Sequence, residues 1–219
     1  MTHSTQPNKK RGFTLAEVMT ALFVFGMLMT GLMEFFISTS VTLQSTQTEL
    51  ATAQGKREAT QNLKLDAKNS DYLLAYDDLT AMADDEEALD SGSRGNIVLF
   101  VTNQVDNNIY DNEAASFDTV VAYYIHTDQA SGTNSLQRVE VGHEEQESGE
   151  SISQMVARVI NSGEIKSRNI TNGFEANLGG DLFYLFRSDS IVVNASIKEG
   201  YGVSEFSKNF NLTLNVSST

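Results

Sequence analysis

The sequence predicts an α+β fold in which a long N-terminal helix crosses a membrane and a mostly antiparallel β domain follows. Fifteen of the 20 residues from Val18 to Ile37 are apolar, and a helix of that length spans about 30 Å of hydrocarbon. The only proline of the chain is Pro7, so no proline interrupts the helix further along. From residue 96 onward, short apolar and alternating runs typical of strands replace the helical pattern.

The helix is expected to continue well beyond the apolar run. Residues 38–62 contain a single glycine, Gly55, but nine of these 25 residues are Ser or Thr, and threonine is a weak helix former. We therefore expect packing on one apolar face to supply the missing stability. The residues expected on that face are Leu43, Leu50 and Ala53, followed by Leu63 and Leu65.

The β domain is expected to contain six strands, and its last run alternates Phe210, Leu212, Leu214 and Val216 on the inward side. Residues 151–160 fit either a short helix or a strand. The runs expected to form strands are 97–101, 119–125, 136–141, 182–186, 190–198 and 206–216.

Composition excludes several classes of function. The 219 residues include no Cys and carry a net charge of −14, which excludes disulfides, zinc–thiolate sites, iron–sulfur clusters and a Cys nucleophile. Residues 66–219 hold 25 acids against 9 bases, a balance of −16, which argues against nucleic acid as a partner. The sequence has no His-Glu-x-x-His, Gly-rich phosphate loop or Gly-x-Ser-x-Gly motif, so we expect no enzymatic activity.

Three positive charges, Lys9, Lys10 and Arg11, come just before the apolar run. The positive-inside rule places this end of the chain in the cytoplasm and the bulk of the chain on the other side of the membrane. A secretory signal peptide and a plain membrane anchor both share this pattern. However, the run passes into Phe35 and Phe36 without the small residues of a signal-peptidase site.

The string from Lys10 to Val18, with Gly12 directly before Phe13, resembles the processing site of type IV prepilins and type II secretion pseudopilins. The resemblance implies that a membrane prepilin peptidase cuts between Gly12 and Phe13 and methylates the new amine of Phe13. It also implies that Glu17, the other marker of the family, pairs with the amine of Phe13 on a neighbouring subunit during assembly.

Glu17 also has a local interpretation. A carboxylate inside a bilayer costs about 2.5–3.5 kcal/mol on insertion scales, so an acid there usually marks a function. Thr14 and Glu17 have the spacing of a capping box, and an acid in the first turn interacts favourably with the helix dipole. The two interpretations are compatible, because a capping residue can be recruited when subunits pack.

The resemblance implies a pilin-like organisation. The first expected segment is a cytoplasmic leader over 1–12. A helix over 13–68 follows, which spans the membrane over about 13–37 and is amphipathic over 38–68. The last segment is an acidic, β-rich periplasmic head over 69–219. The strand with Tyr123 and Ile125, followed by Leu136 and Arg138, resembles the middle of J-class minor pseudopilins. For Arg138 itself, a surface cation and a cation paired inside the head both remain open.

Residues 71–90 contain eight acids and no base. A solvated loop or short helix is one interpretation of this segment. A calcium site is the other, because Ca²⁺ takes several carboxylate oxygens, although the spacing matches no EF-hand. The candidate ligands are Asp77, Asp78, Asp84, Asp85, Glu86 and Glu87.

The expected function is structural. The resemblance implies a minor pseudopilin near the tip of a type II secretion pseudopilus, since major pilins commonly have a helix-kinking proline that this helix lacks. The alternative is a minor type IV pilus subunit that acts in pilus assembly, adhesion or DNA uptake. The expected partners are other pilins or pseudopilins, the prepilin peptidase and the inner-membrane assembly platform. The expected location is the inner membrane and then the filament.

Overall fold

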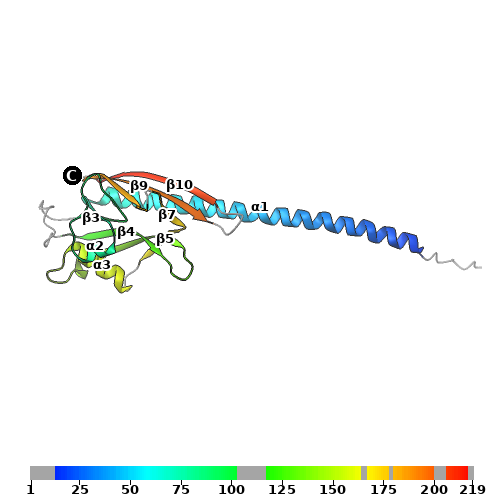
Figure 1. The fold of residues 1–219 in the computed structure, drawn as a ribbon, viewed down its shortest axis with the longest axis horizontal. Coiled ribbons are helices and arrows are strands. Elements are labelled where there is room, and N and C mark those ends of the chain that lie inside the picture. Colours follow the sequence, from blue (N-terminus) through cyan, green and yellow to red (C-terminus); the bar gives the residue numbers. More distant parts are fainter. Residues whose placement is uncertain (1–12, 103–116, 164–166, 178–179, 200–205, 217–219) are drawn as a thin grey trace, which may run out of the picture. The chain divides into compact units, whose positions relative to one another are not determined.

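A computed structural model describes residues 13–102, 117–163, 167–177, 180–199 and 206–216. The chain divides into two compact units, Met1–Thr46 and Gln47–Thr219. Helix α1 (Leu15–Asn69) belongs to both, as the blue-to-cyan helix of Figure 1. The predicted α+β fold, with one long helix followed by antiparallel sheets, is therefore confirmed.

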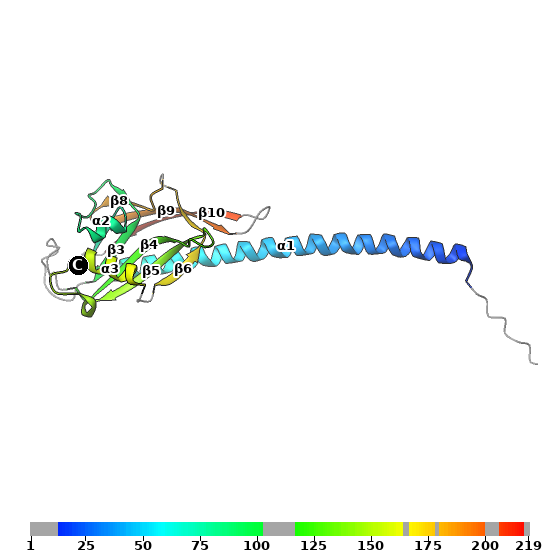
Figure 2. The same ribbon diagram turned by 60° about the horizontal axis from the view of Figure 1, so that its bottom comes forward.

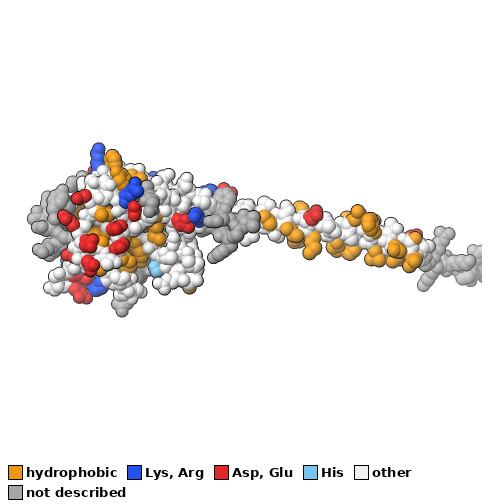
Figure 3. Space-filling model, viewed as in Figure 1, with side chains coloured by type: hydrophobic (Ala, Val, Ile, Leu, Met, Phe, Trp, Pro, Cys, Tyr) orange, Lys and Arg blue, Asp and Glu red, His pale blue; other side chains and the backbone are white. Residues whose placement is uncertain are grey.

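In the N-terminal unit, α1 is long and apolar enough to cross a membrane. Its large apolar side chains are exposed and gather along this part of the helix in Figure 3. The hydroxyls of Thr20 and Thr30 donate to the carbonyls of Ala16 and Gly26 at 2.8 and 3.0 Å. These side chains thus need no water, which suits them to a hydrocarbon environment.

Over its described residues, the C-terminal unit contains two antiparallel sheets, one ordered β1-β3-β4-β5-β6 and the other β10-β9-β8-β2, with β7 paired to β9. The same residues include three short helical elements: α2 (Leu79–Ala83), α3 (Ile152–Ser162) and a 3-10 turn at His143–Glu145. The strands are β1 (Tyr72–Tyr76), β2 (Arg94–Gly95), β3 (Ile97–Thr102), β4 (Thr119–Thr127), β5 (Asn134–Gly142), β6 (Arg168–Asn172), β7 (Phe174–Ala176), β8 (Phe183–Arg187), β9 (Ser190–Glu199) and β10 (Phe206–Asn215).

The first sheet is buried on both faces. Val98 and Phe100 of β3 face a core shared with α1 and the second sheet, whereas Ile97 and Leu99 face a second core shared with α2 and α3. Figures 1 and 2 show α2 and α3 on the side of this sheet opposite the second half of α1. Burial on both faces explains why the strand at Ile97 reads as a continuous apolar run.

The predicted packing face of the helix is largely wrong. Leu50 is 59% exposed and Leu65 57% exposed, and of the expected residues that belong to this unit only Leu63 is buried. The residues of α1 that are buried are Thr52, Ala59, Leu63, Asp66 and Ala67. Small residues form this face because the helix lies close to the sheet: a Cβ added at Gly55 would lie 2.3 Å from Thr171 Oγ1.

All six expected strands are present, with ends that agree to within two residues. The inward alternation of β10 is confirmed, with Phe210, Leu214 and Val216 buried. Residues 151–160 form helix α3, which resolves that ambiguity. In the acidic segment, the expected short helix is present as α2. The expectation did not include β1, a strand that pairs with β3, which begins about 20 residues further along the chain.

Candidate functional site

Thr14 and Glu17 cap the N-terminus of α1 through reciprocal hydrogen bonds. The backbone N–H of Thr14 donates to Glu17 Oε2 at 2.9 Å, and the Thr14 hydroxyl donates to the same oxygen at 3.0 Å. In return, the backbone N–H of Glu17 donates to Thr14 Oγ1 at 3.3 Å. This is the capping box predicted from the spacing, and it satisfies two backbone donors that a helix start leaves unpaired.

Phe13 directly precedes this cap, and its side chain is 88% exposed. Phe13 lies just before the helix, and Glu17 lies in its first turn, so both are at the same end of α1. Both hydrogen bonds to the carboxylate end on Oε2, and within the described residues none reaches Oε1. The cap therefore leaves one carboxylate oxygen able to accept a bond from outside the chain. Gly12, the other predicted processing residue, lies outside the described residues.

Around this site, the N-terminal unit exposes a nearly continuous apolar surface, in which Leu15 and Met19 are 79% and 65% exposed. Soluble proteins rarely leave such an area uncovered. Such an exposed apolar surface is typical of a segment that interacts with a membrane or with another protein, and the capped N-terminus lies at one end of this apolar helix.

The six acidic candidates for a calcium site are not brought together as a ligand set. Asp78 caps α2 by accepting from the backbone N–H groups of Thr80 and Ala81 at 2.8 and 2.9 Å. Asp85 accepts from the hydroxyls of Ser151 and Ser153. The other four, Asp77, Asp84, Glu86 and Glu87, are exposed. In the part of the chain that the structure describes, no group of three or more His, Asp or Glu side chains could hold a metal ion.

Asp66 is the partner of Arg138, which the sequence pattern did not predict. The guanidinium donates from Nε to Asp66 Oδ2 at 2.8 Å and from Nη2 to Oδ1 at 3.1 Å, and Tyr123 also donates to Oδ2. The Nη1 atom of Arg138 also donates to Glu140 at 2.8 Å. Arg138 is thus paired inside the head, and its interpretation as a surface cation is wrong. Burial, together with the Asp66 carboxylate, raises the pKa of the Tyr123 hydroxyl. This buried triad joins α1 to β4 and β5.

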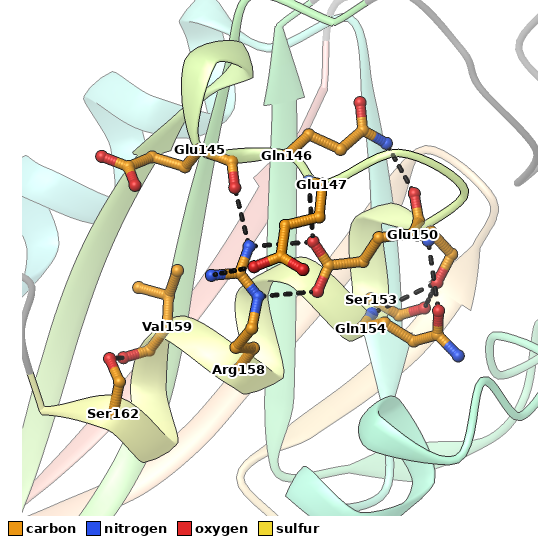
Figure 4. Close-up of polar contacts among 10 residues, drawn as sticks. Glu145, Gln146, Glu147, Glu150, Ser153, Gln154, Arg158, Val159 and Ser162 are labelled. Carbon is orange, nitrogen blue, oxygen red and sulfur yellow. Dashed lines mark hydrogen bonds and ion pairs between the residues drawn. The ribbon is translucent and has the colours of Figure 1, made fainter.

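A second charged network fixes the loop before α3 (Figure 4). Arg158 donates to Glu150 through Nε and Nη2, both at 2.9 Å, and to the carbonyl of Glu145 at 2.7 Å. Hydrogen bonds from Arg158 lower the pKa of the Glu150 carboxyl. Ser151 and Gln154 form a capping box at the start of the helix. These contacts are within one loop and one helix, so they hold this loop against α3.

Comparison with known proteins agrees with the N-terminal geometry. Residues 7–33 match the family described as the prokaryotic N-terminal methylation motif. No curated protein and no solved structure matches the chain. The matched segment includes Phe13, the Thr14–Glu17 cap and most of the apolar run from Val18 to Ile37. This motif stands at the start of a helix that is long and apolar enough to cross a membrane and that leads into an antiparallel head, and together they support the resemblance to type IV pilins and pseudopilins.

Proposed function

We propose that this protein is a minor pseudopilin, assembled near the tip of a type II secretion pseudopilus. Its precursor is held with the leader in the cytoplasm and the head in the periplasm. The peptidase cuts between Gly12 and Phe13 and methylates the amine of Phe13, and the helix then packs among those of other subunits. The observation that carries the proposal is the constellation of Phe13 and a capped Glu17 at the start of an uncovered apolar helix.

Glu17 sets the position of one helix along the next during assembly. In hydrocarbon, an unpaired carboxylate and an unpaired amine are both costly, and pairing them offsets the cost. The charge on Glu17 is therefore stabilised best when the amine of a neighbouring Phe13 approaches it. Because both groups lie at the start of the helix, this pair fixes how far one helix is displaced along the next.

The first test is mass spectrometry of the protein purified from cells with an active prepilin peptidase. The mature chain is expected to begin at Phe13 with a methylated amine. A chain that still begins at Met1 in such cells would overturn the proposed processing.

The second test separates the charge of Glu17 from its role as a cap. Glu17→Gln keeps a capping side chain but removes the charge, and it is expected to leave cleavage intact while lowering incorporation into filaments by about tenfold or more. Thr14→Ala weakens the cap by about 1 kcal/mol but keeps the charge, and a much smaller loss is expected. Glu34→Gln is the matched control, since it neutralises the other acid of the apolar segment. Equal incorporation of Glu17→Gln and Glu34→Gln would refute the role of the charge.

The phenotype of cells that lack this protein distinguishes a type II secretion pseudopilin from a type IV pilus subunit. A type II pseudopilin predicts that secreted proteins accumulate in the periplasm while surface pili remain. Loss of pili, adhesion or DNA uptake with normal secretion would instead assign the chain to a type IV pilus.

A further inference from the structure

A polar groove lies between α1 and β6 in the C-terminal unit. Its volume is about 290 Å³, near the lower end of the range that small-molecule sites occupy. We name it the donor groove, because most of its side chains carry N–H donors. The lining side chains are all polar: Gln54, Arg57, Glu58, Gln61 and Asn62 of α1, and Arg168 of β6. A groove without apolar lining favours a hydrophilic ligand.

The packing of α1 on β6 creates this groove. The residues of α1 that line it recur every three to four positions, so they form one strip along the helix. A Cβ added at Gly55 would meet Thr171 Oγ1, so β6 lies close to the helix beside this strip. Arg168, three residues before Thr171 on the same strand, reaches back to α1, where its Nη2 donates to Glu58 Oε1 at 2.8 Å. Contacts within one chain therefore fix both walls of the groove.

Most of the polar side chains in the donor groove have no partner within the described part of the chain. Over these residues, no side-chain hydrogen bond or ion pair involves Arg57, and none involves the three amides of the lining. Glu58 is the one acid among the six lining residues, and Arg168 neutralises it. The groove therefore presents one guanidinium without a counter-charge and three amides, each of which offers both a donor and an acceptor.

We propose that the donor groove binds a phosphorylated saccharide. A phosphate group accepts the paired N–H groups of a guanidinium in a planar, bidentate geometry, and Arg57 and Arg168 are the two guanidiniums of the lining. The amides beside them match the hydroxyls of a sugar ring, which also donate and accept hydrogen bonds. Two cations against one acid favour an anion over a neutral sugar. This inference goes beyond the proposed function and does not depend on it. The phosphate has two sources, a free sugar phosphate or a phosphate ester on a polysaccharide.

The experiment is equilibrium dialysis of the full-length protein in detergent micelles, with glucose 1-phosphate as the probe. A dissociation constant of about 1 mM is expected, as is ordinary for a small ligand in an open groove. Glucose should bind about tenfold more weakly, because it cannot pair with the arginines. Inorganic phosphate should bind about threefold more weakly, because it leaves the amides without partners. Raising the salt from about 20 mM to about 0.5 M should weaken the binding of glucose 1-phosphate by screening.

Two substitutions change the groove without removing a side-chain contact among the described residues. Arg57→Gln should weaken the binding of glucose 1-phosphate by about threefold to tenfold, the range that one or two exposed charged contacts provide. Gln61→Glu places a carboxylate in the groove and should weaken binding at least as strongly through repulsion. The matched controls are Arg187→Gln and Gln129→Glu, which make the same changes at exposed positions outside the groove and should bind like the natural chain. Circular dichroism confirms that each variant is folded.

A mannan that carries phosphate esters, compared with the same mannan after their removal, distinguishes the two sources. Retention of the protein by the phosphorylated polymer assigns the ligand to a polysaccharide, whereas binding of glucose 1-phosphate alone assigns it to a free sugar phosphate. The proposal is overturned if glucose 1-phosphate does not bind saturably, or if glucose or inorganic phosphate binds equally tightly. It is also overturned if Arg57→Gln and Gln61→Glu bind as well as their controls. None of these measurements involves cleavage, methylation or secretion, so failure of the proposed function is recognised separately.

Discussion

Removing the cation of the buried triad should destabilise the head strongly. In Arg138→Gln, the two bonds from the guanidinium to Asp66 are lost, and the carboxylate, in a residue only 9% exposed, keeps just the Tyr123 hydroxyl. Hydrogen bonds to charged groups are worth about 1.5–3 kcal/mol each, so the pair represents about 3–6 kcal/mol. The Arg138 side chain is 19% exposed, and a glutamine can recover part of one bond. We expect the free energy of unfolding to fall by about 2–4 kcal/mol.

The measurement is urea unfolding of the full chain in detergent micelles, followed by near-ultraviolet circular dichroism of the tyrosines. Arg168→Gln is the matched control because its partner Glu58 is also on α1 but has a half-exposed side chain, and such a pair contributes about 0–1 kcal/mol. Asp66→Asn combined with Arg138→Gln should be more stable than Arg138→Gln alone, because no unpaired carboxylate then remains in the core. If Arg138→Gln unfolds at the same urea concentration as Arg168→Gln, the triad does not stabilise the head.

Two further predictions concern the head. Gly173→Ala should cost about 3–5 kcal/mol, because Gly173 has a φ of +67° and its added Cβ would lie 1.6 Å from the carbonyl oxygen of Lys198. Gly163→Ala, at a φ of +65° but facing open space, should cost only about 1 kcal/mol. If the two variants lose the same free energy of unfolding in urea, the steric explanation is wrong. Burial also raises the pKa of Tyr123 and raises the pKa of Tyr72 to about 12. The folded state therefore holds these two protons when the unfolded state releases them, so the free energy of unfolding should be constant from neutral pH to about pH 10 and fall above it. Tyr123→Phe should flatten that fall in unfolding experiments between pH 8 and pH 11.

The sequence was most informative where a feature is local. The capping box needs only Thr14 and Glu17, three residues apart, and the structure contains all three of its hydrogen bonds. The strand at Ile97 is apolar throughout because both of its faces are buried. In each case the residues that define the feature are neighbours in the chain, so the pattern alone predicts it.

Features that depend on distant partners were not predictable in this way. Strand β1 lies in the most acidic segment of the chain, and only its pairing with β3, from Tyr72 opposite Val101 to Tyr76 opposite Ile97, makes it a strand. Asp66 and Arg138 are 72 residues apart, and nothing in either local sequence specifies the other as partner. One indication of a buried partner was Asp66 itself, an acid in a helical segment that was expected to pack against the head.

The helix face shows why an apolar pattern alone does not identify the buried side of a helix. Counting leucines selects Leu50 and Leu65 as core residues, but both are exposed in the structure. The sheet instead receives Ala59 and the backbone at Gly55, because small residues let the helix lie close to β6. A side chain added at Gly55 would meet Thr171, so size as well as hydrophobicity decides which residues of the helix face the sheet.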